Sequence, residues 1–189
     1  MPEQQRAESM AEHAERILAA VRALPQRHPI VLIDGPSGAG KSTTADLLVR
    51  SWSGPAPVLV RMDDVYPGWH GLARAGEHIG KELLDRLAAG RPGRWQRHDW
   101  ENGSGAERHI VAPGRSVVIE GCGVLTRHNA PLADLRVWID GDPALRRTRA
   151  LERDKGGFDN YWEIWEHQMD AFIAEHDPAG AADLRLRSR

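Results

Sequence analysis

The sequence predicts an α/β protein in which a mainly parallel sheet of five strands lies between two layers of helices. Short apolar runs rich in β-branched residues recur along the chain, as is typical of parallel strands covered on both faces. Segments with apolar residues at helical spacing separate most of these runs. A chain of 189 residues is long enough for one substantial core and too short for two, so we expect a single domain over residues 1–189.

The elements follow in chain order. Apolar residues at helical spacing predict an amphipathic helix over residues 1–24, which Pro25 ends. The apolar runs predict strands at 30–33, 57–61, 116–120, 135–140 and, more weakly, 183–187. Further helices are expected at 43–52, 76–89, 143–154 and 161–176. The region 143–160 joins a helix to the glycine-containing stretch DKGGFDN, so we expect it to form a small helical lid.

Composition excludes several classes of protein. The net charge is -2 with 28% charged residues, so we expect neither a nucleic-acid nor a membrane partner. The single cysteine, Cys122, cannot form an intramolecular disulfide, and nine histidines without metal spacing predict no zinc site. The N-terminal sequence lacks the features of a signal peptide and no run of about 18 apolar residues occurs, so we expect a cytoplasmic protein. A homodimer is one assembly state that the sequence leaves open.

The stretch IDGPSGAGKSTT, residues 33–44, contains the pattern GxxxxGK[ST] directly after a predicted strand and before a predicted helix. Glycines there let successive backbone N–H groups face a phosphate chain at a helix N-terminus. We expect Lys41 to reach the β and γ phosphates of ATP and the Ser42 hydroxyl to bind Mg²⁺. The predicted nucleotide contacts are Gly35, Ser37, Gly38, Ala39, Gly40, Lys41, Ser42 and Thr43.

Acidic residues follow two of the predicted strands. Asp63 lies in RMDDVYPGWHG, where a carboxylate can accept the proton of an attacking hydroxyl and contact the metal. Aspartates also cap turns after strands, and this alternative stays open for Asp63 and its neighbour Asp64. Glu120 ends the run SVVIE and completes a predicted metal set with Ser42 and Asp63.

Two further groups of side chains could reach a ligand. Arg146, Arg149 and Arg153 fall on one helix face, where they could neutralise phosphate charge from the lid or form a solvated basic stripe. Among the seven tryptophans, Trp69 and Trp100 are expected in loops, as is Trp95. Such rings could stack on a flat acceptor or pack beneath the loops.

Together the motifs GPSGAGKST, DDVYPG, HDW, VVIEG and RRTRALERD resemble the uridine kinase and related phosphoribulokinase and pantothenate kinase branch of phosphate-loop kinases, over about residues 29–154. The resemblance implies that Asp63 is the catalytic base and a metal contact and that Tyr66 touches the acceptor. It implies an acidic site residue at Glu120 and lid arginines at Arg149 and Arg153. It also implies a nucleoside-site segment at His98, Asp99 and Trp100.

The chain departs from this family in one segment. Nucleoside kinases of the branch carry an F-D-H-P segment that binds the ribose diol, whereas this chain has only PGWHGLARA between Tyr66 and the helix beginning at residue 76. The phosphate loop is also similar to that of bacterial cytidylate kinases. These comparisons leave the acceptor open.

We therefore predict a Mg²⁺- and ATP-dependent kinase that phosphorylates a hydroxyl of a small molecule, with a nucleoside such as uridine or cytidine as the first candidate. Its predicted catalytic residues are Lys41, Asp63, Arg149 and Arg153, with Arg146 as a further nucleotide contact. The predicted acceptor contacts are Asp63, Tyr66, Trp69, His98, Asp99 and Trp100. A nucleoside monophosphate kinase and a non-catalytic ATP-binding module remain alternatives. The absence of an NKxD motif argues against a GTPase switch.

Overall fold

Five parallel strands form the central sheet of the computed structural model, which describes residues 2–188 and, for side chains, residues 9–188. The strand order is β2-β5-β1-β6-β7. The strands are β1 (Ile30–Asp34), β2 (Val58–Arg61), β5 (Val117–Glu120), β6 (Leu135–Gly141) and β7 (Leu184–Ser188). All five match the apolar runs of the sequence, and the predicted α/β fold class is confirmed.

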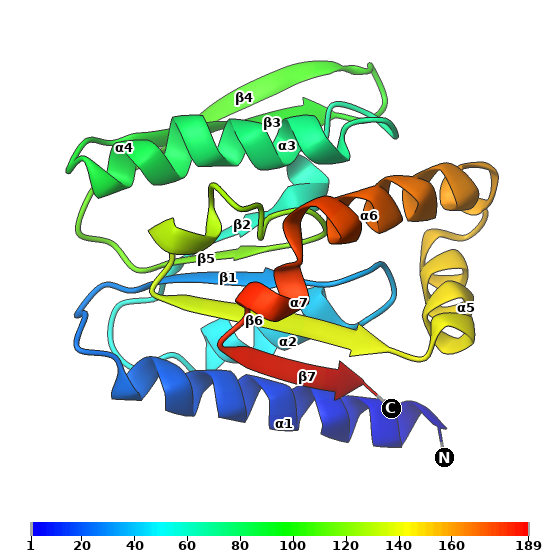
Figure 1. The fold of residues 1–189 in the computed structure, drawn as a ribbon, viewed down its shortest axis with the longest axis horizontal. Coiled ribbons are helices and arrows are strands. Elements are labelled where there is room, and N and C mark those ends of the chain that lie inside the picture. Colours follow the sequence, from blue (N-terminus) through cyan, green and yellow to red (C-terminus); the bar gives the residue numbers. More distant parts are fainter. Residues whose placement is uncertain (1, 189) are drawn as a thin grey trace.

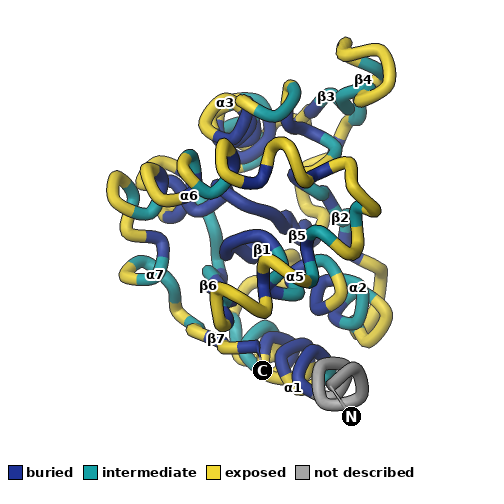
Figure 2. Tube along the Cα trace, turned by 90° about the vertical axis from the view of Figure 1, so that its right-hand side faces the viewer, coloured by how far each residue is buried: buried dark blue, intermediate teal, exposed yellow. Residues whose placement is uncertain are grey.

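Helices cover both faces of this sheet, which gives three layers (Figures 1 and 2). One layer contains α1 (Pro2–Ala23) and α2 (Lys41–Arg50). The other contains α3 (Leu72–His78), the π-helix η2 (Ile79–Leu84), α4 (Asp85–Ala88), α6 (Trp162–His176) and α7 (Pro178–Ala181). In β1, Val31 and Ile33 pack toward α1 and α2 whereas Leu32 packs toward the other layer, because successive strand side chains alternate between faces.

The carboxyl ends of the strands point to the side where α5 (Pro143–Asp154) lies (Figure 1). Short 3₁₀ turns connect several elements: η1 (Met62–Asp64), η3 (Ala130–Leu132) and η4 (Asp159–Tyr161). Strand register places Glu120 beside Ile33 on one neighbouring strand and beside Arg61 on the other. Parallel pairing therefore brings the residues that follow β1, β2 and β5 to one edge of the sheet.

A separate two-stranded antiparallel sheet packs above α3 (Figure 1). It consists of β3 (Gly93–Asp99) and β4 (Ser104–Val111). The prediction that Trp95 lies in a loop is therefore wrong. This residue lies in β3, is buried, and stacks on His109 with ring centres 4.2 Å apart. The pair lacks a continuous apolar pattern because much of its surface is exposed, so hydrophobic periodicity alone could not identify it.

Among the described residues, no helix combines the length and apolar character needed to cross a lipid bilayer.

Candidate active site

The phosphate loop runs from the end of β1 to the start of α2, as its sequence context predicts. Gly35, Gly38 and Gly40 all have positive φ, at 149°, 76° and 92°. The Lys41 side chain bends back over the loop, and its ammonium group donates to the carbonyls of Gly35 at 2.7 Å and Pro36 at 3.0 Å. The loop thus holds the lysine over its own backbone, at the N-terminus of α2.

Gly35 has no room for a side chain, since a Cβ there would overlap the carbonyl oxygen of Ile139 in β6. We expect Gly35→Ala to lower the free energy of unfolding by more than about 3 kcal/mol, because both the backbone angle and this overlap oppose the alanine. Gly54 is a matched control with φ of 85° and nothing within 4 Å of the position that a Cβ would take. Gly54→Ala should cost only about 1 kcal/mol in urea denaturation. Equal losses would contradict the packing of the loop against β6.

A cavity of about 80 Å³ lies against the phosphate loop, and we call it the phosphate cavity. Its lining consists of Ser37, Gly38, Gly40, Lys41, Ser42, Thr43, Asp63, Glu120, Gly121, Cys122, Arg149, Ala150 and Arg153. The structure thereby brings together most of the predicted nucleotide contacts, the predicted carboxylates and two of the arginines predicted to lie in a lid. Gly35 and Ala39 do not line it, since Gly35 packs against β6 and Ala39 is fully buried beside α1.

Oxygen ligands converge on one side of this cavity. The Ser42 hydroxyl donates to Glu120 Oε2 at 3.2 Å, and Arg61 donates to Glu120 Oε1 at 3.2 Å. Burial, and then the nearby charge of Asp63, raises the pKa of Glu120. A hydroxyl and carboxylates are the hard oxygen ligands that Mg²⁺ prefers, so this set fits the predicted metal.

Asp34 is a fully buried carboxylate that the sequence analysis did not single out. It accepts backbone N–H bonds from Gly35 at 2.6 Å, Gly123 at 3.0 Å and Leu125 at 2.7 Å. These bonds tie the phosphate loop to the segment that follows β5. The motif IDGPSG contains this aspartate, but only the fold reveals its partners.

Burial raises the pKa of Asp34 from its ordinary 3.8 to about 6, against the opposing effect of its N–H donors. Because the folded-state pKa is the higher one, the stabilisation linked to protonation is complete below pH 3.8 and is lost as the pH rises through about 6. This rise corresponds to roughly 3 kcal/mol. We expect the stability of the wild type relative to Asp34→Asn to fall by up to this amount between pH 4 and pH 7, measured by denaturant unfolding. If the free energy of unfolding of the wild type and of Asp34→Asn changed with pH in the same way, the raised pKa of Asp34 would be contradicted.

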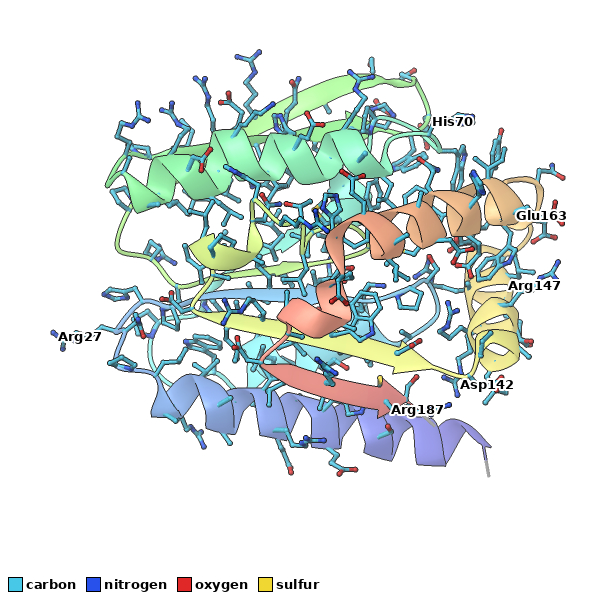
Figure 3. All side chains as sticks on the ribbon, in the orientation of Figure 1. Arg27, His70, Asp142, Arg147, Glu163 and Arg187 are labelled. Atoms are coloured by element: carbon cyan, nitrogen blue, oxygen red, sulfur yellow. The ribbon has the colours of Figure 1, made fainter. Side chains whose placement is uncertain are left out.

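The three predicted arginines of α5 separate into two roles. Arg149 and Arg153 line the phosphate cavity. Arg146 does not: it is buried, donates from Nη1 to the Ser37 carbonyl at 3.1 Å, and lies 3.6 Å from carboxylate oxygens of Asp140 and Glu166. It therefore supports the loop from outside the cavity. Arg147, which precedes Thr148 on the same helix, points away from the molecule (Figure 3).

A second cavity of about 340 Å³ adjoins the first, and we call it the aromatic cavity. Its lining consists of Ser37, Ser42, Arg61, Asp63, Tyr66, Trp69, Trp100, Arg153, Asp154, Phe158 and Trp165. Asp63 and Arg153 line both cavities, together with Ser37 and Ser42. A ligand in the aromatic cavity could therefore approach, beside Asp63, a phosphate group that lies in the phosphate cavity.

Only one residue of the HDW segment reaches the aromatic cavity. The Trp100 indole N–H donates to the Asp63 carbonyl at 2.9 Å. His98 instead lines a different cavity between the hairpin and α3, and the Asp99 carboxylate accepts bonds from Glu101 and Asn102 in the hairpin turn. The structure does not bring His98 or Asp99 to the predicted acceptor site, because the local strand and turn direct them elsewhere.

No protein-family model matches the sequence. A curated uridine kinase from Lactiplantibacillus plantarum is 25% identical over 144 residues, which cover 68% of this chain and 69% of the relative. A solved structure titled as a possible uridine kinase from Bacillus stearothermophilus superposes with a TM-score of 0.67 at 19% identity, covering 93% of this chain and 97% of the other. The chain resembles the uridine kinase-like phosphate-loop kinases. This confirms the resemblance read from the motifs and supports the prediction of a phosphate-loop kinase.

The sequence analysis missed several residues that line the two cavities. Arg61 sits at the end of β2, and Cys122 lies with its sulfur 3.4 Å from Lys41 Nζ. Phe158 and Trp165 line the aromatic cavity, although the helical spacing around Trp165 predicts a core stripe. Trp165 is only 4% exposed, so it belongs to the core and also borders the aromatic cavity. A helical stripe cannot reveal that one member also borders a cavity.

Proposed function

We propose that the protein is a Mg²⁺- and ATP-dependent kinase that transfers the γ-phosphoryl group to a hydroxyl of a small molecule, with a nucleoside such as uridine or cytidine as the first candidate. The observation that carries this proposal is the shared position of Asp63, which borders the phosphate cavity and the aromatic cavity. A carboxylate at such a junction can serve an acceptor on one side and a phosphate on the other.

The nucleotide would be held by the phosphate loop. Backbone N–H groups of the loop and the Lys41 ammonium provide donors for its phosphates. Ser42 and Glu120 would hold Mg²⁺, which when bound neutralises charge on the phosphate oxygens. Arg149 and Arg153 border the same cavity from α5 and would stabilise the negative charge that develops during transfer.

The acceptor hydroxyl would approach from the aromatic cavity. Asp63 accepts its proton as the hydroxyl oxygen forms its bond to the γ-phosphorus, and ADP departs with the electrons of the broken bond. Trp100 holds the Asp63 backbone through its indole N–H, so the hairpin helps to position this carboxylate. The chain's own contribution is thus binding, orientation and one proton transfer.

The proposal is tested with the full chain by calorimetric titration of ATP with Mg²⁺ and by coupled ADP release with uridine, cytidine and CMP. We expect ATP to bind and the nucleosides to stimulate ADP release. Turnover with CMP but not with nucleosides would support the nucleoside monophosphate kinase instead. ATP binding without acceptor-dependent release would support a non-catalytic module, and no ATP binding would refute the kinase.

A further inference from the structure

Aromatic rings dominate the walls of the aromatic cavity. Its five ring residues are Tyr66, Trp69, Trp100, Phe158 and Trp165. They come from three separate parts of the chain: the loop after η1, the turn between β3 and β4, and the segment from Phe158 through η4 into α6. An aromatic-lined space next to Asp63 favours a ligand that carries a flat, apolar ring.

The rings are fixed by contacts with one another. Trp69 stacks on Tyr161 with centres 4.6 Å apart and planes 6° apart, and on Phe158 at 5.1 Å and 18°. Trp100 leans toward Trp69 with a centre distance of 4.9 Å. Because the cluster is already packed, a ring that enters the cavity would meet preformed walls and would have little side-chain ordering to impose.

Polar atoms on two of these rings are already engaged with the backbone. The Tyr66 hydroxyl donates to the Cys122 carbonyl at 2.8 Å, and the Trp100 indole donates to the Asp63 carbonyl at 2.9 Å. Trp100, which is 41% exposed, can therefore offer its ring surface to a ligand more readily than its hydrogen-bonding group, whereas the buried Tyr66 ring forms part of the cavity wall. Contact with ring surfaces tolerates different ring substituents, since it does not depend on matched donors and acceptors.

Each guanidinium group in the aromatic cavity is paired within the chain. Arg61 contacts Asp46 at 2.5 Å and Glu120 at 3.2 Å. Arg153 contacts Asp154 at 2.8 Å. An anionic acceptor would have to displace one of these carboxylates and would also meet the negative charge of Asp63, so the electrostatics favour an uncharged acceptor.

The two carboxylates that line the aromatic cavity, Asp63 and Asp154, have few free oxygen atoms to accept hydrogen bonds from a ribose diol. Asp154 is held by Arg153 through both of its oxygens, at 2.8 and 3.3 Å. Asp63 is assigned to the reacting hydroxyl. Within the described lining of the cavity, no further carboxylate is present to accept bonds from a diol.

We propose that the acceptor is an uncharged alcohol with a flat ring, which the aromatic cavity binds through ring contacts and without recognising a ribose diol. This inference rests on the proposed kinase function and narrows its substrate class. It excludes nucleoside monophosphates and acidic alcohols as preferred acceptors, and it admits ring alcohols that lack ribose.

The first test compares kcat/KM for five acceptors in coupled ADP release: uridine, 2′,3′-dideoxyuridine, D-ribose, CMP and pantothenate. A site built around hydrogen bonds to a hydroxyl rejects an analogue without it by about 10⁴- to 10⁵-fold. We expect dideoxyuridine to stay within about tenfold of uridine, and the other three to fall at least about 100-fold below it. A loss above about 100-fold for dideoxyuridine, or better turnover of CMP or pantothenate, would overturn the inference.

The second test uses Trp100, which is 41% exposed and can be replaced with little risk to the core. Trp100→Ala should raise KM for uridine by roughly 10- to 100-fold, the loss expected for one stacked ring. Trp100→Phe keeps a ring but loses the bond to Asp63, and should keep KM close to the wild type. Trp52, which packs beside α1 and α2, provides the control Trp52→Phe. Equal increases in KM for the alanine and phenylalanine variants would contradict ring contact.

Failure of the kinase proposal has a different signature from failure of this inference. If ATP does not bind, or if none of the five acceptors stimulates ADP release, the proposed function fails and the inference falls with it. If CMP or pantothenate is the preferred acceptor, the kinase stands and only the uncharged ring acceptor is refuted.

Discussion

Replacing Asp63 by asparagine is expected to lower kcat for acceptor phosphorylation by about 10²- to 10⁴-fold, the usual contribution of a general base. The amide keeps the size of the side chain but cannot take the proton of the hydroxyl. ATP should still bind with a similar Kd, because the phosphate loop supplies its main contacts. Steady-state kinetics and calorimetric titration of ATP measure the two quantities separately.

Asp64 provides a matched control for this variant. It is the adjacent aspartate, it is partly buried, and it lines neither the phosphate cavity nor the aromatic cavity. Asp64→Asn should therefore leave kcat within about threefold of the wild type. A large loss of kcat in both variants, or in Asp64→Asn alone, would mean that the base has been misassigned.

The second large effect is expected for Lys41→Met, which should lower kcat/KM for ATP by about 10²- to 10³-fold. Methionine keeps much of the side-chain volume but removes the positive charge that we propose binds the β and γ phosphates. Lys41 is 7% exposed and its ammonium is held by two loop carbonyls, so the variant's melting temperature must be measured beside its kinetics.

Lys81 supplies the comparison for the loss of a lysine charge. It lies on the surface of η2, where its ammonium is 3.4 Å from the Glu77 carboxylate four residues earlier. Lys81→Met should change stability by no more than about 0.5 kcal/mol and should leave catalysis unchanged. If Lys41→Met kept wild-type turnover in a folded protein, the phosphate loop would not be the ATP site.

The five strands and the phosphate loop were predictable because the information that specifies them is contiguous. Strands such as β1 and β5 are short apolar runs that need cover on both faces, and a parallel sheet provides that cover. The loop is one uninterrupted segment whose glycines fix its backbone. In the strands and in the phosphate loop, the structure predicted from the local sequence is the one that the folded protein adopts.

The β3–β4 hairpin was not predictable by the same reasoning. Its strands are half-exposed and largely polar, and an irregularity in register falls between Gln96 and His98. Such a ribbon is stabilised by contacts with its partner strand and with the layer below it, such as the stacking of Trp95 on His109. These contacts join residues that no short window of sequence contains.

The α/β sheet, the phosphate loop and the chemical types of the carboxylates and arginines near it can be read from the sequence alone. Which of these side chains meet depends on the folded chain: Asp63 reaches both cavities, Arg146 supports the loop from outside, and His98 and Asp99 lie elsewhere. The difference lies in the distance along the chain over which each kind of interaction acts. Backbone preferences and apolar periodicity act over a few residues, whereas a cavity wall is assembled from side chains that chain folding brings together from distant segments.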